Sequence, residues 1–340
     1  MSDVTAAEIE KQAQEFNDNF NRVKSEISKV IVGNEPIIDG VLTCLLANGH
    51  ALLEGVPGLG KTLLVRTLAQ AVHLKFSRIQ FTPDLMPADI SGTNILVEGE
   101  AGGKQFQFQQ GPVFANIVLA DEINRATPKT QSAMLEAMQE HHVTVAGVQH
   151  ILNEPFFVLA TQNPIEMEGT YPLPEAQLDR FLYKLIVPTP TFEELAVIVD
   201  RTTGGSTAEV SPVLDGESIL KMRKLAREIP IATHIREYAI KLVLATHPTT
   251  PEATSMVKQF ARFGSSPRGA QAVVVAAKIR ALLHGRFNVA FEDITEVAKP
   301  ALRHRILLNF EGEAEGISTD LIVDDILTRL QEGSKVKVAV

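Results

Sequence analysis

A short glycine-rich segment has the residue types and the spacing that bind phosphate groups. It reads Gly55-Val56-Pro57-Gly58-Leu59-Gly60-Lys61-Thr62, and it lies between an apolar run and an amphipathic stretch. Glycines let consecutive backbone N–H groups turn toward phosphate oxygens, and the start of the following helix adds favourable partial charge. Lys61 is expected to reach the β and γ phosphates, and the Thr62 hydroxyl to ligate Mg²⁺. The segment therefore predicts a nucleoside triphosphate site.

Two carboxylates, Asp121 and Glu122, end an apolar run that begins at Ile117. We expect Asp121 to hold Mg²⁺ through water, and Glu122 to orient and polarise the water that attacks the γ phosphorus. This arrangement favours hydrolysis over transfer to a small molecule. An apolar run ending in Asp-Glu also occurs where a strand simply leaves the core, so the catalytic interpretation depends on the phosphate-binding segment.

Two further polar residues fit the same chemistry. Asn163 follows the next strand pattern and is expected to hydrogen-bond the attacking water or the γ phosphate, although an asparagine before proline also suits an ordinary turn. Ser266-Pro267-Arg268 reads as the start of a helix, where the helix dipole repels a cation, so Arg268 suggests a nearby anion and is expected to reach the γ phosphate of its own subunit. A solvated arginine is the alternative.

Arg180 lies in the sequence Leu178-Asp179-Arg180-Phe181. The apolar neighbours predict a rigid helix from which the guanidinium projects outward. Arginines stabilise the charge that develops in phosphoryl transfer, either within a subunit or from a neighbouring one. Arg180 is therefore a candidate arginine finger.

Five short apolar segments predict strands, and each alternates with a longer segment of helical character. They cover residues 50–53, 76–80, 117–120, 156–161 and 183–187. This alternation predicts an α/β fold with a five-stranded parallel sheet and helices on both faces. Two hairpins are also expected, one pairing residues 94–97 with 105–109 and the other residues 143–145 with 148–152.

A change of pattern after residue 187 predicts a domain boundary. Pro188-Thr189-Pro190-Thr191 interrupts the alternation, and Thr191 followed by Glu194 forms a capping box that opens a helix. Beyond it we expect only helices. The predicted organisation is a nucleotide-binding core over residues 1–188, with hairpin inserts near 84–110 and 143–153, and an all-helical lid over residues 192–340.

The composition is that of a packed globular protein. The chain has 340 residues, of which 45% are hydrophobic and 21% are charged. Its apolar runs are shorter than the ~18 residues of a membrane span, and the N-terminus lacks a signal-peptide layout, so we expect a soluble, cytoplasmic protein without membrane insertion. The single cysteine, Cys44, excludes an internal disulfide. The net charge of −9 disfavours nucleic acid as a partner, although residues 258–305 are rich in Lys and Arg.

With these motifs the chain resembles the AAA+ ATPases, and within them the MoxR family, over nearly its whole length from Val30 onward. The resemblance includes the phosphate-binding segment and the Asp-Glu pair. The other segments that carry it are Val32–Glu35, Phe81–Gly92, Gly111–Phe114, Ala120–Ala126, Ala160–Pro164 and Leu173–Phe181.

The resemblance implies a ring-forming ATPase, usually a hexamer, that binds ATP and Mg²⁺ at subunit interfaces. Lys61 and Thr62 then belong to Walker A, Asp121 and Glu122 to Walker B, and the metal ligands are Thr62 and Asp121. Asn163 corresponds to sensor 1, Arg268 to sensor 2 and Arg180 to the finger, with Arg125 as the alternative finger. The nucleotide-binding residues implied are Val32 and Gly33 at the adenine, and Gly55, Pro57, Gly58, Leu59, Gly60, Lys61, Thr62 and Leu63 at the phosphates.

The resemblance also implies a biological role. MoxR ATPases act as chaperone-like machines that mature or activate protein complexes, in some cases by helping to insert metal ions or cofactors, and commonly alongside von Willebrand factor A domain proteins. The alternatives are a nucleic-acid-directed AAA+ motor, the motor subunit of a metal chelatase, and a nucleotide-binding scaffold that does not hydrolyse ATP.

Overall fold

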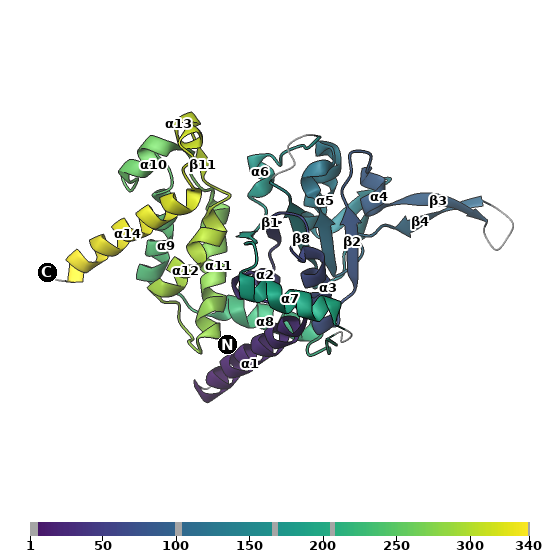
Figure 1. The fold of residues 1–340 in the computed structure, drawn as a ribbon, viewed down its shortest axis with the longest axis horizontal. Coiled ribbons are helices and arrows are strands. Elements are labelled where there is room, and N and C mark those ends of the chain that lie inside the picture. The colour runs from purple at the N-terminus through teal and green to yellow at the C-terminus, as the bar shows by residue number, and fades with distance from the viewer. Residues whose placement is uncertain (1–5, 99–103, 165–168, 205–207, 339–340) are drawn as a thin grey trace. The chain divides into compact units, whose positions relative to one another are not determined.

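The chain folds into two compact units (Figure 1). The computed structural model describes residues 6–98, 104–164, 169–204 and 208–338. The unit that we call the sheet unit consists of Asn21–Arg180 and Leu185–Leu220. The unit that we call the helical unit consists of Met1–Phe20, Phe181–Lys184 and Lys221–Val340. The domain ranges predicted from sequence, residues 1–188 and 192–340, stay a prediction.

The sheet unit is built on a five-stranded parallel sheet in the order β2-β5-β8-β1-β9. Its strands are β1 (Ala51–Glu54), β2 (Phe76–Gln80), β5 (Ile117–Asp121), β8 (Phe157–Gln162) and β9 (Tyr183–Ile186). β5 is buried along its whole length and pairs with β2 on one side and β8 on the other. Such strands read as continuous apolar runs because both faces of a parallel sheet are covered. The predicted sheet is therefore confirmed, with each strand end within one residue of its expected place.

Helices precede, connect and follow these strands. They are α2 (Glu35–Leu46), α3 (Lys61–Ala71), α4 (Pro87–Ser91), the 3₁₀ helix η1 (Ile123–Arg125), α5 (Pro128–Glu140), α6 (Glu175–Leu178) and α7 (Phe192–Thr203). The capping box predicted at the start of α7 is present: the Thr191 hydroxyl accepts from the Glu194 amide, and the Glu194 carboxylate accepts from the Thr191 amide. α1 (Ala6–Val30), which the sequence analysis did not predict, precedes them.

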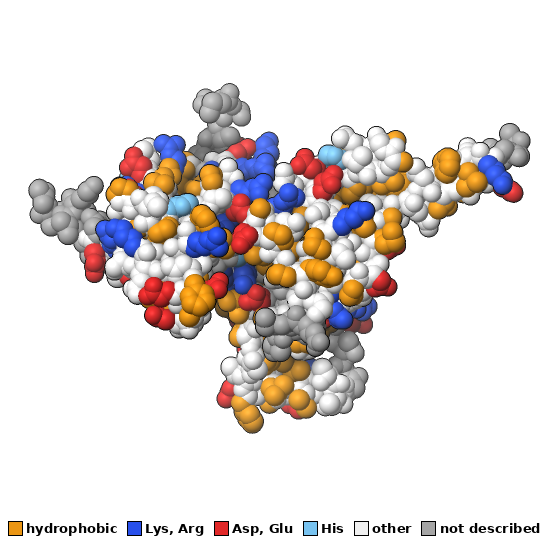
Figure 2. Space-filling view, turned by 90° about the horizontal axis from the view of Figure 1, so that it is seen from above, with side chains coloured by type: hydrophobic (Ala, Val, Ile, Leu, Met, Phe, Trp, Pro, Cys, Tyr) orange, Lys and Arg blue, Asp and Glu red, His pale blue; other side chains and the backbone are white. Residues whose placement is uncertain are grey.

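Both predicted hairpins are confirmed. The first pairs β3 (Gly92–Glu98) with β4 (Lys104–Gln110) and stands away from the sheet (Figure 1); its predicted turn, residues 99–103, lies outside the described residues. Hydrophobic side chains are exposed along it (Figure 2), and Phe106 is 76% exposed. The second pairs β6 (His142–Val145) with β7 (Val148–Ile151).

The helical unit contains most of the predicted lid helices and a small β-ribbon that was not predicted, whereas α7, which begins at Phe192, lies in the sheet unit. Its helices are α9 (Thr233–Leu244), α10 (Ser255–Phe260), α11 (Pro267–Leu283), α12 (Phe291–Leu302), α13 (Phe310–Ala314) and α14 (Thr319–Val338), while α8 (Gly216–Glu228) runs from the sheet unit into this one. None of the helices in the described parts of the chain combines the length and the apolarity needed to cross a bilayer.

The expectation that only helices follow residue 191 is wrong in one detail. β10 (Ala261–Phe263) pairs in antiparallel fashion with β11 (Leu307–Leu308). Strands of this length are too short to produce the alternation by which a strand is recognised, and their pairing joins segments far apart in the chain. The lid is therefore helical but not entirely so.

The backbone at Gly92, where α4 passes into β3, requires glycine. Its φ is +93°, and an added Cβ would lie against the carbonyl oxygen of Gln109 and 2.6 Å from the Gly111 nitrogen. Gly147 has a similar φ of +81° but open space around it. We expect Gly147→Ala to lower the free energy of unfolding by about 1–2 kcal/mol, the cost of left-handed backbone, and Gly92→Ala by about 3 kcal/mol or more. Urea unfolding measures both, and equal losses would contradict the steric argument.

Candidate active site

The carboxyl ends of four neighbouring strands bring the glycine-rich segment, the Asp-Glu pair and Asn163 to one edge of the sheet. β1 ends at the glycine-rich segment, β5 at Asp121, and β8 just before Asn163. β2 ends at Gln80, which lies directly opposite Asp121 in the strand register. Because the strands are parallel, their polar ends lie side by side where open α/β sheets bind ligands.

The glycine-rich segment leads from β1 into α3. Gly58 and Gly60 have φ values of +83° and +73°, and both have open space where a Cβ would lie. Gly60 is the N-cap of α3, and no side chain caps this helix end. The first-turn N–H groups of α3 are therefore available to an anion, which the helix dipole also favours.

Lys61 is half-buried at the start of α3 and turns back toward the segment. Its ammonium donates to the Gly55 carbonyl oxygen at 2.6 Å. Burial lowers the pKa of Lys61, and nearby carboxylates, Asp121 first among them, oppose that shift. A partly desolvated ammonium is stabilised by an anionic hydrogen-bond acceptor, such as a phosphate oxygen.

Asp121 is buried, 8% exposed, and its two oxygens have different partners. Oδ1 accepts from the Thr161 hydroxyl at 2.7 Å, and Oδ2 accepts from Nε and Nη2 of Arg78 at 3.0 and 2.6 Å. A buried carboxylate requires such compensation. Sequence reasoning missed Arg78, because only the pairing of β2 with β5 brings it to Asp121.

Glu122 adopts a left-handed backbone conformation, with φ of 56°. Its amide donates to the Thr161 hydroxyl at 2.8 Å. Its Oε2 accepts from Gln80 Nε2 at 3.0 Å and from Arg125 Nη1 at 2.9 Å. Left-handed backbone at a residue other than glycine costs of order 1–3 kcal/mol and is concentrated at functional sites. The sequence analysis also missed Gln80, which holds the carboxylate from the neighbouring strand.

The residues at this edge have the chemistry needed to bind a nucleoside triphosphate with Mg²⁺. The uncapped start of α3 and the half-buried Lys61 supply donors and positive charge for phosphates. Thr62, half-buried in the first turn of α3, and Asp121 supply the hard oxygen ligands that Mg²⁺ prefers. The roles of these residues as ligands remain a proposal.

The other nucleotide-contact predictions are placed as follows. Gly55 is buried, Leu59 is half-buried, and Pro57 and Leu63 are exposed. Val32 and Gly33 lie half-buried between α1 and α2, and the space beside Gly33 is filled by the Glu194 carboxylate. Whether Val32 and Gly33 line an adenine pocket stays a prediction. Asn163 is 4% exposed and lies just beyond β8, at the same sheet edge as Glu122.

The expectation for Arg180 is wrong in its local geometry. α6 ends at Leu178, so Arg180 lies in the turn that follows a four-residue helix and not on a rigid helix. Its guanidinium is half-buried, and Nη1 donates to the Leu135 carbonyl oxygen at 2.7 Å, so the side chain turns back into its own subunit. The apolar neighbours reflect burial of Phe181 and not a helix face.

Two other arginines named from sequence occupy distinct places. Arg125 pairs with Glu122 in the same chain. Arg268 is exposed and follows Ser266, the predicted N-cap of α11, whose hydroxyl accepts from the Arg268 amide at 3.1 Å. Arg268 belongs to the helical unit, so its reach toward the phosphate site stays a prediction.

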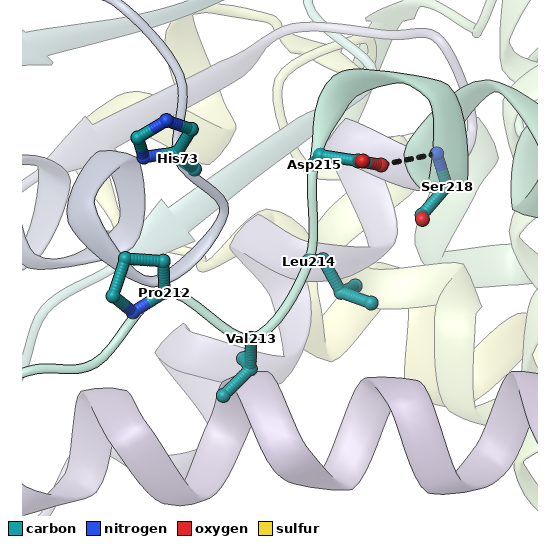
Figure 3. A pocket seen from close by; sticks show the side chains of 6 residues that line it. All are labelled: His73, Pro212, Val213, Leu214, Asp215 and Ser218. Carbon is teal, nitrogen blue, oxygen red and sulfur yellow. Dashed lines mark hydrogen bonds between the residues drawn. The ribbon is translucent and has the colours of Figure 1, made fainter.

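A separate hollow lies at the other end of α3 from the glycine-rich segment (Figure 3). It measures about 350 Å³ and is lined by His73, Pro212, Val213, Leu214, Asp215 and Ser218. The Asp215 carboxylate accepts from the Ser218 amide, so this polar group caps a helix.

Two family models match the chain. The model described as "ATPase family associated with various cellular activities (AAA)" matches residues 50–183, which contain the whole sheet edge. The model described as "AAA lid domain" matches residues 253–326.

Relatives with similar sequences match almost the full length of the chain. Chaperone MoxR1 of Mycobacterium tuberculosis is 43% identical over 308 residues, which are 91% of this chain and 81% of that protein. Protein MoxR of Paracoccus denitrificans is 30% identical over 335 residues, or 92% of this chain and 96% of that protein. The crystal structure of a candidate ATPase from Cytophaga hutchinsonii is 41% identical, with a TM-score of 0.86 over 94% of this chain and 96% of that one.

Lys61 gives the sharpest test of the phosphate site. We expect Lys61→Ala to lower ATP affinity by about tenfold or more, because a charge-assisted contact contributes about 1.5–3 kcal/mol, and to abolish turnover. A fluorescent ATP analogue measures the affinity. Lys104→Ala, an exposed lysine on β4, is the matched control. If Lys61→Ala and Lys104→Ala bound ATP with equal affinity, the glycine-rich segment would not be the ATP-binding site.

Proposed function

This chain belongs to the MoxR family of AAA+ ATPases, which are enzymes that hydrolyse ATP. We propose that it hydrolyses ATP at the sheet edge where Lys61, Asp121 and Glu122 lie. The observation that supports this most directly is the position of the Asp-Glu pair. Thr161 and Gln80 lie on the two strands that flank β5. Thr161 donates to the Asp121 carboxylate and Gln80 to the Glu122 carboxylate, at the same sheet edge as the segment that contains Lys61.

The proposed division of roles follows from the contacts of each residue. The N–H groups at the start of α3, with Lys61, bind and orient the phosphates. Glu122 orients a water molecule and accepts its proton, and its Oε2 is already held by Gln80 and Arg125. In this proposal Asn163, which directly follows β8, hydrogen-bonds the same water. Thr62 and Asp121 would hold Mg²⁺, which when bound neutralises charge on the phosphates.

We propose that two arginines complete the site from other parts of the assembly. Arg268 serves the phosphate of its own subunit, and Arg180 serves that of a neighbour in a ring, for which six subunits is the expected number. To act in this way, the Arg180 guanidinium must release the Leu135 carbonyl to which it donates. A single hydrogen bond of this kind contributes about 1–3 kcal/mol, which new contacts with a phosphate offset.

The proposed cellular role rests on family membership and on a relative that is named a chaperone. We propose that ATP turnover drives remodelling, maturation or activation of protein complexes in the cytoplasm, including metal or cofactor insertion. Proteins with von Willebrand factor A domains are the proposed clients. The exposed β3–β4 hairpin offers apolar side chains to such a partner (Figure 2).

The solution mass of Glu122→Gln tests the shared site. This variant keeps the size and the hydrogen-bonding capacity of the side chain but lacks the base, so we expect it to bind ATP, to hydrolyse it at least about 100-fold more slowly, and to retain assembled rings. Light scattering with and without Mg-ATP measures the mass, and Lys61→Ala is the control that should not respond. A single-subunit mass with ATP bound would contradict the ring.

Mixing two inactive variants tests the trans role of Arg180. Arg180→Ala should bind ATP but turn it over about 10³-fold more slowly, as expected for loss of an arginine finger. Mixed with Lys61→Ala, which keeps Arg180, it should regain activity, because each variant supplies what the other lacks. The double variant Lys61→Ala/Arg180→Ala is the control partner. If Arg125→Ala and not Arg180→Ala is rescued in this way, Arg125 is the finger.

A further inference from the structure

Three consecutive residues that follow α12 bind the backbone immediately after Arg180. His304 Nε2 donates to the Phe181 carbonyl oxygen at 3.0 Å, and Arg305 Nη2 donates to the same oxygen at 2.6 Å. Arg305 Nη1 donates to the Leu182 carbonyl at 3.1 Å, and Arg303 Nη1 to the Lys184 carbonyl at 3.3 Å. We call Arg303, His304 and Arg305 the carbonyl clamp. All of these contacts lie within the helical unit.

Two of the three clamp residues, His304 and Arg305, are buried, and burying such groups costs free energy unless they are hydrogen-bonded. His304 is 5% exposed and Arg305 is 7% exposed. Burial, together with the neighbouring Arg305, lowers the pKa of His304 well below its usual range. His304 is therefore neutral, and its proton is on Nε2, because a carbonyl oxygen only accepts. Buried polar groups of this kind fix geometry tightly, since losing a partner leaves a desolvated group unpaired.

The clamp also contacts the start of α11. A Cβ on Gly269 would lie 3.1 Å from Arg305 Cδ and 3.1 Å from Leu302 Cδ2. Gly269 directly follows Arg268 in the chain. The aliphatic part of Arg305 thus packs on the residue after Arg268, while its guanidinium binds the residue after Arg180. One side chain connects the backbones next to both arginines.

The clamp is anchored on a third element. Arg303 donates from Nε and Nη2 to the two Asp320 oxygens at 2.9 and 2.8 Å, in the first turn of α14. This paired geometry restrains the guanidinium more than a single contact does. Packed and hydrogen-bonded groups thus connect the start of α11 to Phe181–Lys184 without a break.

We propose that the carbonyl clamp couples Arg268 to Arg180, so that nucleotide bound in one subunit sets the position of the arginine which that subunit offers to its neighbour. His304 and Arg305 are positioning residues in this scheme, because they act through the backbone at residue 181. The peptide bond then carries the displacement to Arg180, whose Cα lies one peptide, about 3.8 Å, from that of Phe181. This inference rests on the proposed roles of Arg180 and Arg268.

Amide hydrogen exchange tests the coupling without relying on activity. A slowly hydrolysed ATP analogue with Mg²⁺, at a concentration that saturates each variant, is added to protein dilute enough that its solution mass does not change. Peptides covering residues 176–184 are expected to exchange at least about fivefold more slowly with the nucleotide, the lower end for coupled sites. Arg268→Ala should remove this response. His304→Leu should bind nucleotide and also lose the response.

Two variants separate positioning from folding. His304→Gln keeps an N–H donor and should restore the response, whereas a purely structural histidine would not be rescued by this change. If His304→Leu does not fold, the test of the coupling rests on Arg268→Ala. The Arg268 side chain is exposed, so we expect this variant to fold. An unchanged nucleotide response in Arg268→Ala, or in a folded His304→Leu, overturns the clamp. Absence of nucleotide binding in the unaltered protein instead overturns the proposed function.

Discussion

The hydroxyl group of Thr161 fixes the two carboxylates of the site relative to each other and to the next strand. It donates to Asp121 Oδ1 and accepts from the Glu122 amide. Thr161 can do so because β8 runs parallel to β5, with Ala120 opposite Ala160 in the register. A slip of one residue would turn its side chain to the other face of the sheet. The placement of metal ligand and base therefore depends on this strand pairing and on one buried hydroxyl.

Charge balance at the sheet edge follows from the same pairing. Arg78 compensates the buried Asp121 carboxylate, and its Nη2 also donates to Gln80 Oε1 at 2.5 Å. Gln80 in turn donates to Glu122, which Arg125 approaches from η1. The result is a continuous hydrogen-bonded chain that runs from Asp121 through Arg78, Gln80 and Glu122 to Arg125. Such a network fixes the orientation of two adjacent carboxylates, and the loss of one member would disturb the next.

The helical unit uses buried polar groups in a comparable way. In the carbonyl clamp the acceptors are backbone oxygens, so the clamp fixes the course of the chain and not the orientation of a side chain. The segment that it holds, Phe181–Lys184, includes the first two residues of β9. Both places rely on charged or polar side chains whose removal leaves desolvated partners, which is why their geometry is well defined.

Local sequence determined much of this protein. The phosphate-binding segment, the apolar strands that end in Asp121 and just before Asn163, and the Ser266 cap of α11 were predictable because each is encoded within a few neighbouring residues. Periodicity, turn chemistry and capping act over that range, so the sheet, both hairpins and the lid helices follow from the chain alone.

Tertiary structure decided the contacts between distant segments. Arg78 and Gln80 meet the Asp-Glu pair only because β2 pairs with β5, and Arg305 reaches Phe181 across more than a hundred residues of chain. The turn of Arg180 toward Leu135 and the β10–β11 ribbon have the same origin. No local pattern encodes such contacts, because they arise where packing brings together side chains whose spacing along the chain carries no period.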